Sequence, residues 1–396
     1  MAVVSLVRSK ITDESKIEEM VRTVLEPLGG VEGFVSKGDR VVLKPNLVTN
    51  RKYFTGATTD PLIVLALIHE LKRIGVSDIT VADGSWVGCP TERAFTATGL
   101  SGLCAREGVK LVNLQRDEYV SVKVSAGNEL KGKVNIAKTV LDADKLINLP
   151  KLKAHAQTKL TLSLKNLKGC ISDDEKRRFH RIDIDRAIAE LNTVLSPDLI
   201  VLDGIVGEMT AELGCDPIRL DTIVAGTDPV ALDALCATMM GYDPHEIEHI
   251  VHAEELGVGK GLDTSKIELK GDVELASIKG EIGDSVGFAR YTESFQSYGL
   301  DIQESGACSS CLAALYLALK RVADDEKLED LQGCSFYIGQ NFAEDSDGSA
   351  TPAGEGGSAY RIGIGNCTKA LDGLDIFTKG CPPTALTVYR KLRRKF

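Results

Sequence analysis

Four cysteines in the last quarter of the sequence have the type and spacing of metal–sulfur ligands. Cys308 and Cys311 form a C-x-x-C pair, and Cys367 and Cys381 lie in the segments "GNC" and "GCPP". Neighbouring glycine and proline suit neither a helix nor a central strand, so packing alone does not explain these thiols. Iron–sulfur clusters commonly take four cysteine thiolates. We therefore predict that these four residues bind one [4Fe–4S] cluster.

Other interpretations of these cysteines remain open. Structural zinc usually repeats a tight C-x2-C pair, whereas Cys367 and Cys381 are fourteen positions apart. A redox-active pair at Cys308 and Cys311 leaves the other two thiols without a role. All four could also be small core residues. Cys334 begins a strand-like run, so we expect it in the core and keep it as the reserve ligand.

The context of the last two cysteines carries a resemblance. "GNC", a strand and "GCPP" together resemble the last two cluster-ligand positions in the small iron–sulfur subunits of proton-pumping NADH:quinone oxidoreductases and nickel–iron hydrogenases. The match covers only these residues, so it implies ligand identity more than a shared fold.

A second candidate site is the basic stretch "LPKLKAHAQTKLTLSLKNLKGC", residues 149–170, in a chain with a net charge of -10. Local positive charge in an acidic protein indicates an anion site, although a solvated basic helix face is the alternative. We predict His155 and Lys165 as catalytic residues, because histidine titrates near neutrality. The binding residues predicted from this stretch are Lys153, Asn166 and Lys168.

Polar residues at strand ends extend this site. Lys44 and Asn46 follow one predicted strand, and Asp83 and Asp203 end two others. In open α/β sheets the ligand crevice lies outside the carboxyl ends of the strands, so we expect all four to face one cleft. The sequence contains neither of the two nucleotide-binding fingerprints, G-x-G-x-x-G after a strand and G-x-x-x-x-G-K-[ST]. The segment "GVGKG" at 257–261 is too short for a phosphate-binding loop.

The elements that must position these residues alternate between strands and helices. "RVVLKPN", "DPLIVLALIHELKRIG" and "DITVADG" read as strand, helix and strand, which predicts a mostly parallel sheet with covering helices. Near residue 285 short strand-like pieces replace this rhythm. We expect an α/β body over 1–285, with possible subdomains of about 1–145 and 146–285, and a small α+β cysteine-ligand domain over 286–396.

Composition limits the classes of partner and location. The net charge of -10 argues against nucleic acid as a partner. No apolar run is long enough to span a bilayer, and ten cysteines without a disulfide pattern fit the cytoplasm. We expect a cytoplasmic protein without a membrane partner, and its candidate partners are a small anionic molecule and a redox partner protein.

Six blocks in order resemble the family of domain of unknown function 362: "VVLKPNLV", "TDPLIVLALIHELKRIG", "ITVADGS", "KLINLPKLKAHAQTKLTLSLKNLKG", "LIVLDGI" and "GTDPVALDALCATMMGYDP". Many members carry a C-terminal ferredoxin-type module, from which this sequence departs. The body is also distantly similar to the lactate racemase family, in which a histidine and a lysine ten residues apart serve the nickel cofactor and the substrate. His155 and Lys165 have that spacing.

These observations predict an iron–sulfur redox protein, an oxidoreductase acting on a small anionic substrate or cofactor in an α/β cleft. Two alternatives remain. The first is a non-catalytic electron-transfer or cluster-assembly partner, and the second is a racemase-like or isomerase-like enzyme. Anaerobic iron and sulfide analysis is the most informative test.

Overall fold

The chain forms two compact units. The computed structural model describes the sequence except for residues 211, 272, 284–285, 288–289, 291–292, 294, 296 and 343–359. The first unit consists of Met1–Lys153, Leu160–Glu208 and Asp216–Asp284. The second consists of Ala154–Lys159, Met209–Cys215 and Ser285–Phe396. Two short segments of the body therefore belong to the second unit.

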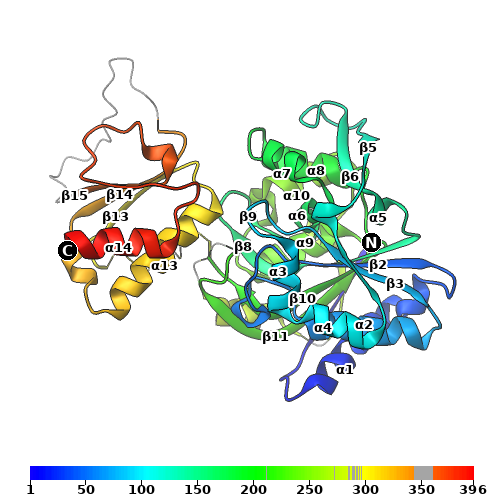
Figure 1. The fold of residues 1–396 in the computed structure, drawn as a ribbon. Coiled ribbons are helices and arrows are strands. Elements are labelled where there is room, and N and C mark those ends of the chain that lie inside the picture. The colour runs from blue at the N-terminus through cyan, green and yellow to red at the C-terminus, as the bar shows by residue number, and fades with distance from the viewer. Residues whose placement is uncertain are drawn as a thin grey trace. The chain divides into compact units, whose positions relative to one another are not determined.

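A ten-stranded sheet is the framework of the first unit (Figure 1). Strands β4, β3, β2, β7 and β10 are successive parallel neighbours, β11 runs antiparallel between β10 and β1, and β12 pairs in parallel with β1. Off this path, β8 pairs with β10 and β9. The predicted mostly parallel sheet is confirmed. The bounds are β1 Ala2–Arg8, β2 Arg40–Pro45, β3 Asp78–Asp83, β4 Lys110–Asn113, β7 Lys145–Leu149, β8 Lys151–His155, β9 Lys159–Leu160, β10 Leu199–Glu208, β11 Pro217–Gly226 and β12 Ile267–Lys270.

Helices of the first unit begin at caps that the sequence supplies. Asp60 accepts a hydrogen bond from the N–H of Leu62, and Asp228 accepts from Val230 and Ala231. In both places proline follows the aspartate, where its missing N–H costs nothing. The bounds are α1 Glu14–Leu25, α2 Pro61–Arg73, α3 Thr91–Thr98, α4 Leu100–Glu107, α5 Lys138–Leu141, α6 Leu162–Asn166, α7 Asp173–Phe179, α8 Ile184–Asn192, α9 Pro229–Met239, α10 Glu248–Glu255 and α11 Leu275–Ile282, with a hairpin of β5 Tyr119–Lys123 and β6 Lys133–Ala137.

The core of the first unit lies between the sheet and α2. Ile63, Val64, Leu67 and Leu71 of this helix are fully buried against strand residues such as Leu43. Each such side chain contributes about 1.5–3 kcal/mol on burial. The strands whose ends carry polar residues are therefore packed against this buried apolar core.

The second unit is built on a smaller sheet of four strands, all parallel, in the order β13-β14-β15-β16. Helices α13 and α14 pack on each other, and Val388 and Leu392 of α14 are buried in a core with Leu315, Leu319 and Phe336. The bounds are β13 Asp301–Ser305, α13 Ser309–Asp324, β14 Cys334–Gly339, β15 Tyr360–Ile364, β16 Ile376–Thr378 and α14 Ala385–Lys395.

Hydropathy of the helices bears on a membrane location. Within the described part of the chain, no helix is both long and apolar enough to cross a bilayer.

Candidate functional site

Lys44 and Asp83 form a buried ion pair where two parallel strands end. Lys44 lies on β2 and Asp83 closes the neighbouring β3, and Nζ of the lysine is 2.6 Å from Oδ1 of the aspartate. Their side chains are 0% and 3% exposed. Oδ2 of Asp83 accepts the N–H of Leu47 at 2.8 Å. The carboxylate thus fixes both the lysine and the loop after β2.

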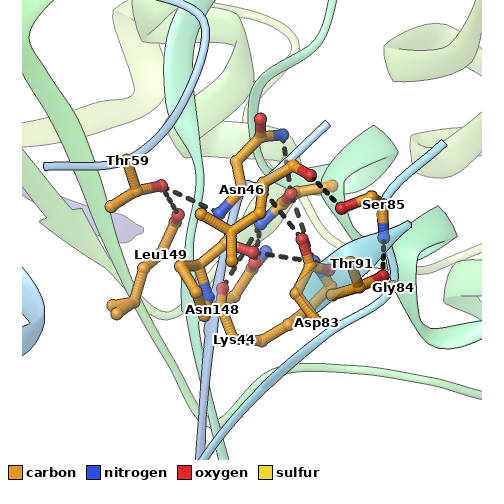
Figure 2. Close-up of polar contacts among 12 residues, drawn as sticks. Lys44, Asn46, Thr59, Asp83, Gly84, Ser85, Thr91, Asn148 and Leu149 are labelled. Carbon is orange, nitrogen blue, oxygen red and sulfur yellow. Dashed lines mark hydrogen bonds and ion pairs between the residues drawn. The ribbon is translucent and has the colours of Figure 1, made fainter. Parts of the chain in front are cut away.

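Asparagines continue this pair into a network, which we name the buried lysine network (Lys44, Asn46, Asp83, Asn148 and Asn166). Nζ of Lys44 also donates to the carbonyl of Pro45 at 3.0 Å and to Asn166 Oδ1 at 3.3 Å. The Asn166 amide then accepts from Asn46 and donates to Asn148. Figure 2 shows Lys44, Asn46, Asp83 and Asn148 converging. All three protons of Lys44 are used inside the protein.

Hydroxyl groups tie the surrounding loops to the same strand ends (Figure 2). Thr59 accepts the N–H of Asn46 and donates to the carbonyl of Leu149, both at 2.8 Å. Ser85 donates to the carbonyl of Leu47 at 2.6 Å. The loops after β2 and β3 are therefore held to each other and to the end of β7 by side chains as well as by their strands.

A second buried pair joins β8 and β10. Lys151 Nζ lies 2.6 Å from Oδ2 of Asp203, which also accepts the N–H of Asp60 at 2.7 Å. Burial, and then the charge of Asp203, raises the pKa of Asp60 to about 6. Lys153 donates to Asn46 Oδ1 and to the carbonyl of Ala57, both at 2.8 Å.

The basic stretch is therefore not a solvated helix face at Lys151 and Lys153, which lie on strand β8 and are both 0% exposed. Lys165, on α6, is 7% exposed, and Lys168 Nζ lies 5.3 Å from the centre of the Phe179 ring. These four lysines all belong to the first unit. The structure brings Lys44, Asn46, Asp83, Lys153 and Asn166 into one set of contacts and Lys151 and Asp203 into another.

His155 belongs to the second unit, in the segment Ala154–Lys159, whereas its predicted partner Lys165 belongs to the first. Its side chain is 3% exposed, and Nε2 lies 3.3 Å from Oε1 of Glu212. Sequence reasoning missed Glu212, because its loop is remote in the chain and has no motif. The assignment of His155 and Lys165 as catalytic residues stays a prediction.

The four predicted cluster ligands lie at one edge of the smaller sheet. Strands β13, β15 and β16 end at residues 305, 364 and 378, so Cys308, Cys367 and Cys381 each follow a strand end by three residues. Cys308 is also the N-cap of α13, which places Cys311 in its first turn. We name the edge carrying these four thiols the cysteine edge. Carboxyl ends of parallel strands necessarily share one edge, which explains the convergence.

Hydrogen bonds hold the loops of the cysteine edge together. The N–H of Asn366 donates to the carbonyl of Gly380 at 2.8 Å, and Asn366 Oδ1 accepts the N–H of Gly380 at 2.9 Å. Gly365 has a φ of +85°, and a Cβ there would lie 3.3 Å from Cys311 Sγ. These contacts bring Cys311 next to the loops of Cys367 and Cys381.

Electrostatics agrees with this grouping. A hydrogen bond from the Cys311 thiol lowers the pKa of Cys308, and backbone N–H groups of Cys311 and Ser310 add to the shift. The same hydrogen bond raises the pKa of Cys311, followed by burial and by the charges of Cys308, Cys367 and Cys381. Helix N-termini favour thiolates, so the start of α13 suits an anionic ligand set.

Cys334 lies at the opposite end of the sheet. It is the first residue of β14, is 0% exposed and packs in the core of the second unit. Burial raises its pKa to about 11. At about 3.3 Å per residue, β14 separates it from the cysteine edge by about 16 Å. Its geometry is that of a core residue.

Binding of an iron–sulfur cluster at the cysteine edge stays a prediction. Among the described residues, no group of three or more His, Cys, Asp or Glu side chains is arranged to hold one metal ion. A four-iron cluster is ligated at separate iron atoms, so its thiolates stand further apart than ligands of one ion. The cysteines outside the cysteine edge are all buried: Cys89, Cys104, Cys170, Cys215, Cys236 and Cys334.

Comparison with known proteins finds a similar sequence, a similar solved structure and a matching family. A thylakoid-associated protein of Synechocystis sp. is 32% identical over 265 residues, covering 64% of this chain and 79% of that protein. The lactate racemase apoprotein of Thermoanaerobacterium thermosaccharolyticum aligns with 13% identity and a TM-score of 0.36 over 60% of this chain. This chain spans 57% of the racemase. The model of the family "Domain of unknown function (DUF362)" matches residues 41–238, half of the sequence, so the chain belongs to the DUF362 family, as its six sequence blocks predict.

Proposed function

We propose that the chain is an iron–sulfur redox protein in which Cys308, Cys311, Cys367 and Cys381 hold one [4Fe–4S] cluster. The observation that carries the proposal is the meeting of these cysteines at one edge of a parallel sheet. Cys308, Cys367 and Cys381 each lie three residues beyond the end of a strand, and Cys311 lies in the first turn of α13. When bound, such a cluster exchanges single electrons at a potential set by hydrogen bonds and solvent exposure.

Unequal burial of the four thiols supports exchange with a redox partner protein. Cys311 is 6% exposed, whereas Cys367 and Cys381 are both exposed. A partner would approach from the side of the two exposed cysteines, while the buried side anchors the cluster to α13. The partner is part of this proposal.

A small anionic substrate or cofactor is proposed for the first unit, at the carboxyl ends of its parallel strands. Ligands of open α/β sheets bind at this position, and the lysines of the basic stretch supply positive charge there. In this proposal the chain is an oxidoreductase, and Lys165, Lys168 and Lys153 attract the anion. We also propose a cytoplasmic location, where thiols stay reduced.

One observation favours the non-catalytic alternative. The protons of Lys44 are all donated within the buried lysine network, and Lys151 is paired with Asp203, so these lysines act as framework rather than as ligand contacts. An electron carrier or cluster-assembly partner needs no substrate site. Optical spectra during turnover discriminate the two, because an oxidoreductase must cycle its cluster when substrate is added.

Anaerobic purification tests the cluster itself. We expect brown protein containing about four iron and four sulfide per chain, as for other four-thiolate clusters. One zinc per chain without sulfide would overturn the proposal in favour of a structural metal site.

A further inference from the structure

The hairpin of β5 and β6 has one strand with an open edge. The two strands form a sheet of their own in the first unit (Figure 1). Within the described part of the chain, β5 pairs with no strand except β6, and their register is regular from Tyr119 opposite Ala137 to Lys123 opposite Lys133. β5 is therefore an edge strand, and its outer backbone groups can pair with another strand.

Hydrogen bonds at both ends of the hairpin show which residues of β5 turn their backbone outward. The N–H of Lys138 donates to the carbonyl of Glu118, and the N–H of Val124 donates to the carbonyl of Gly132. Hydrogen-bonded positions alternate along an antiparallel pair, so the even-numbered positions of β5 bond to β6. The odd-numbered residues, whose N–H and C=O groups point away from β6, are Tyr119, Ser121 and Lys123. These outward groups form no hydrogen bond with any residue that the structure describes.

Side chains of β5 leave an apolar face open at the same edge. Val120 and Val122 lie on one face of the hairpin, opposite Ile136 and Val134 of β6. The two β6 residues are 0% exposed, whereas Val120 is 40% exposed. The apolar face therefore continues from buried β6 to the open edge, where a further strand would cover it.

Other edge strands carry a protection that β5 lacks. Proteins guard sheet edges with charged side chains, proline or very short strands. In β12 Glu268 pairs with Lys270, β13 carries Asp301 and Glu304, and β16 has only three residues. The central residues of β5, Val-Ser-Val, include neither a charge nor a proline. Its edge is thus suited to pairing rather than guarded against it.

Charge indicates which strand fits this edge. Asp117 and Glu118 precede β5, and Lys123 ends it. An antiparallel second copy, with Ser121 on the two-fold axis, places Lys123 opposite Tyr119 of the partner subunit and diagonal to Asp117 of the partner subunit. Opposite charges at such positions stabilise a strand pair, and like charges directly opposite destabilise it. The acidic start and basic end of β5 are therefore complementary to β5 itself in the antiparallel direction.

We infer that β5 is the interface of a homodimer, in which two hairpins join into one four-stranded antiparallel sheet. Ser121 pairs with the partner's Ser121, and Tyr119 pairs with the partner's Lys123. Three such residue pairs form about six main-chain hydrogen bonds. Val120 lies opposite the partner's Val122, which extends the apolar face across both copies. A two-stranded sheet is marginally stable alone, and contact through the same surface of both copies closes the assembly.

Sedimentation equilibrium of the whole chain tests this interface. Reducing conditions keep the exposed Cys367 and Cys381 from joining copies by disulfides. We expect a reversible equilibrium between monomer and dimer. Ser121→Pro removes one outward N–H from each copy and should raise the dissociation constant about ten- to a hundredfold. Val120→Lys places a charge on the edge and should weaken the dimer at least as much.

A charge reversal on each strand provides a matched control. Lys123→Glu places an acid diagonal to Asp117 of the partner subunit and should raise the dissociation constant about threefold or more. Lys133→Glu makes the same change on β6, on the side away from the interface, and should leave the constant within about twofold of the wild type. Hydrogen exchange measured by mass spectrometry locates the contact, because the amides of residues 119–123 should exchange more slowly at high protein concentration than at low.

Three results would overturn the inference. The first is a monomer at every concentration, even if the same edge bound a different protein. The second is a dimer whose dissociation constant is the same in wild type, Ser121→Pro and Val120→Lys, because the copies would then join elsewhere. The third is exchange at residues 119–123 that does not depend on concentration, as expected for an edge strand without a partner. Circular dichroism checks the fold of each variant, and Lys123→Glu carries the test if the other two misfold.

Discussion

Lys44 is buried with its charge matched, which makes its loss costly. In Lys44→Met, Asp83 keeps its burial but loses its cation, and breaking a buried pair in this way costs about 3–5 kcal/mol of the free energy of unfolding. Lys110 and Asp78 form an equivalent pair between the neighbouring strands β4 and β3, with side chains 65% and 39% exposed. Lys110→Met should therefore cost only about 0–1 kcal/mol.

Urea unfolding of both variants measures the difference. Equal losses of stability would mean that the Lys44 pair is solvated in solution, and the buried lysine network would then lose its structural role.

Removal of single thiols separates ligand from core. Cys367→Ser should lower the iron content of anaerobically prepared protein sharply, because the cluster loses one of four thiolates. Cys334→Ala should leave iron and sulfide near the wild-type values, since Cys334 lies in the core at the other end of β14. Iron loss in Cys334→Ala with iron retained in Cys367→Ser would show that Cys334, and not Cys367, is the cluster ligand.

At this scale the sequence predicts residue types better than their partners. Flanking glycines and prolines single out Cys367 and Cys381, and strand-end positions single out Lys44 and Asp83. The charge that neutralises each lysine comes from another strand, so no local pattern reports it. Glu212 meets His155 only through the tertiary fold.

At the scale of the elements, a carboxylate of α9 accepts hydrogen bonds from the first turn of α6. Oδ1 and Oδ2 of Asp233 accept the N–H groups of Ser163 and Leu164 at 2.8 and 2.9 Å. Burial outweighs these two bonds and raises the pKa of Asp233 to about 8 from 3.8. Because the folded pKa is the higher one, the folded state holds this proton more tightly than the unfolded chain.

Stability from this group is therefore fully present below about pH 4 and is lost as the pH rises towards 8. Asp233→Asn cannot titrate and should flatten the pH dependence of the free energy of unfolding over that window. Urea unfolding at several pH values measures it, with Asp228→Asn, at the N-cap of α9, as the control. A slope unchanged from wild type in Asp233→Asn would show that other groups set the pH dependence.

Local patterns identify most elements and fail where composition misleads. The capped helices and the apolar strands follow from their periodicity. Strand β8 is different, because "KLKAH" has the charge of a surface segment and yet every residue in it is buried. "GVGKG" shows the converse. The N–H groups of Lys260 and Gly261 are bound to carboxylates of Asp228 and Glu254, so this glycine-rich loop is satisfied by its own chain.

For the whole molecule, two compact units predict two unfolding transitions. A ligand that binds only the folded state raises the stability of the unit that holds it. Loading with iron and sulfide should therefore raise the midpoint of one calorimetric transition and leave the other in place. Cys367→Ser should remove the increase. A shift of both transitions by the same amount would indicate that the units unfold as one.

The two short segments of the body that belong to the second unit, Ala154–Lys159 and Met209–Cys215, constrain how the C-terminal part could be gained or lost in evolution. Ala156, Leu213 and Cys215 pack with the core of the C-terminal part, although they lie within the stretch that matches the family. A recombination event at a single point near residue 285 would leave these side chains without their neighbours. Acquisition or loss of the C-terminal part thus requires matching changes at three places in the gene, which favours descent of the two units together.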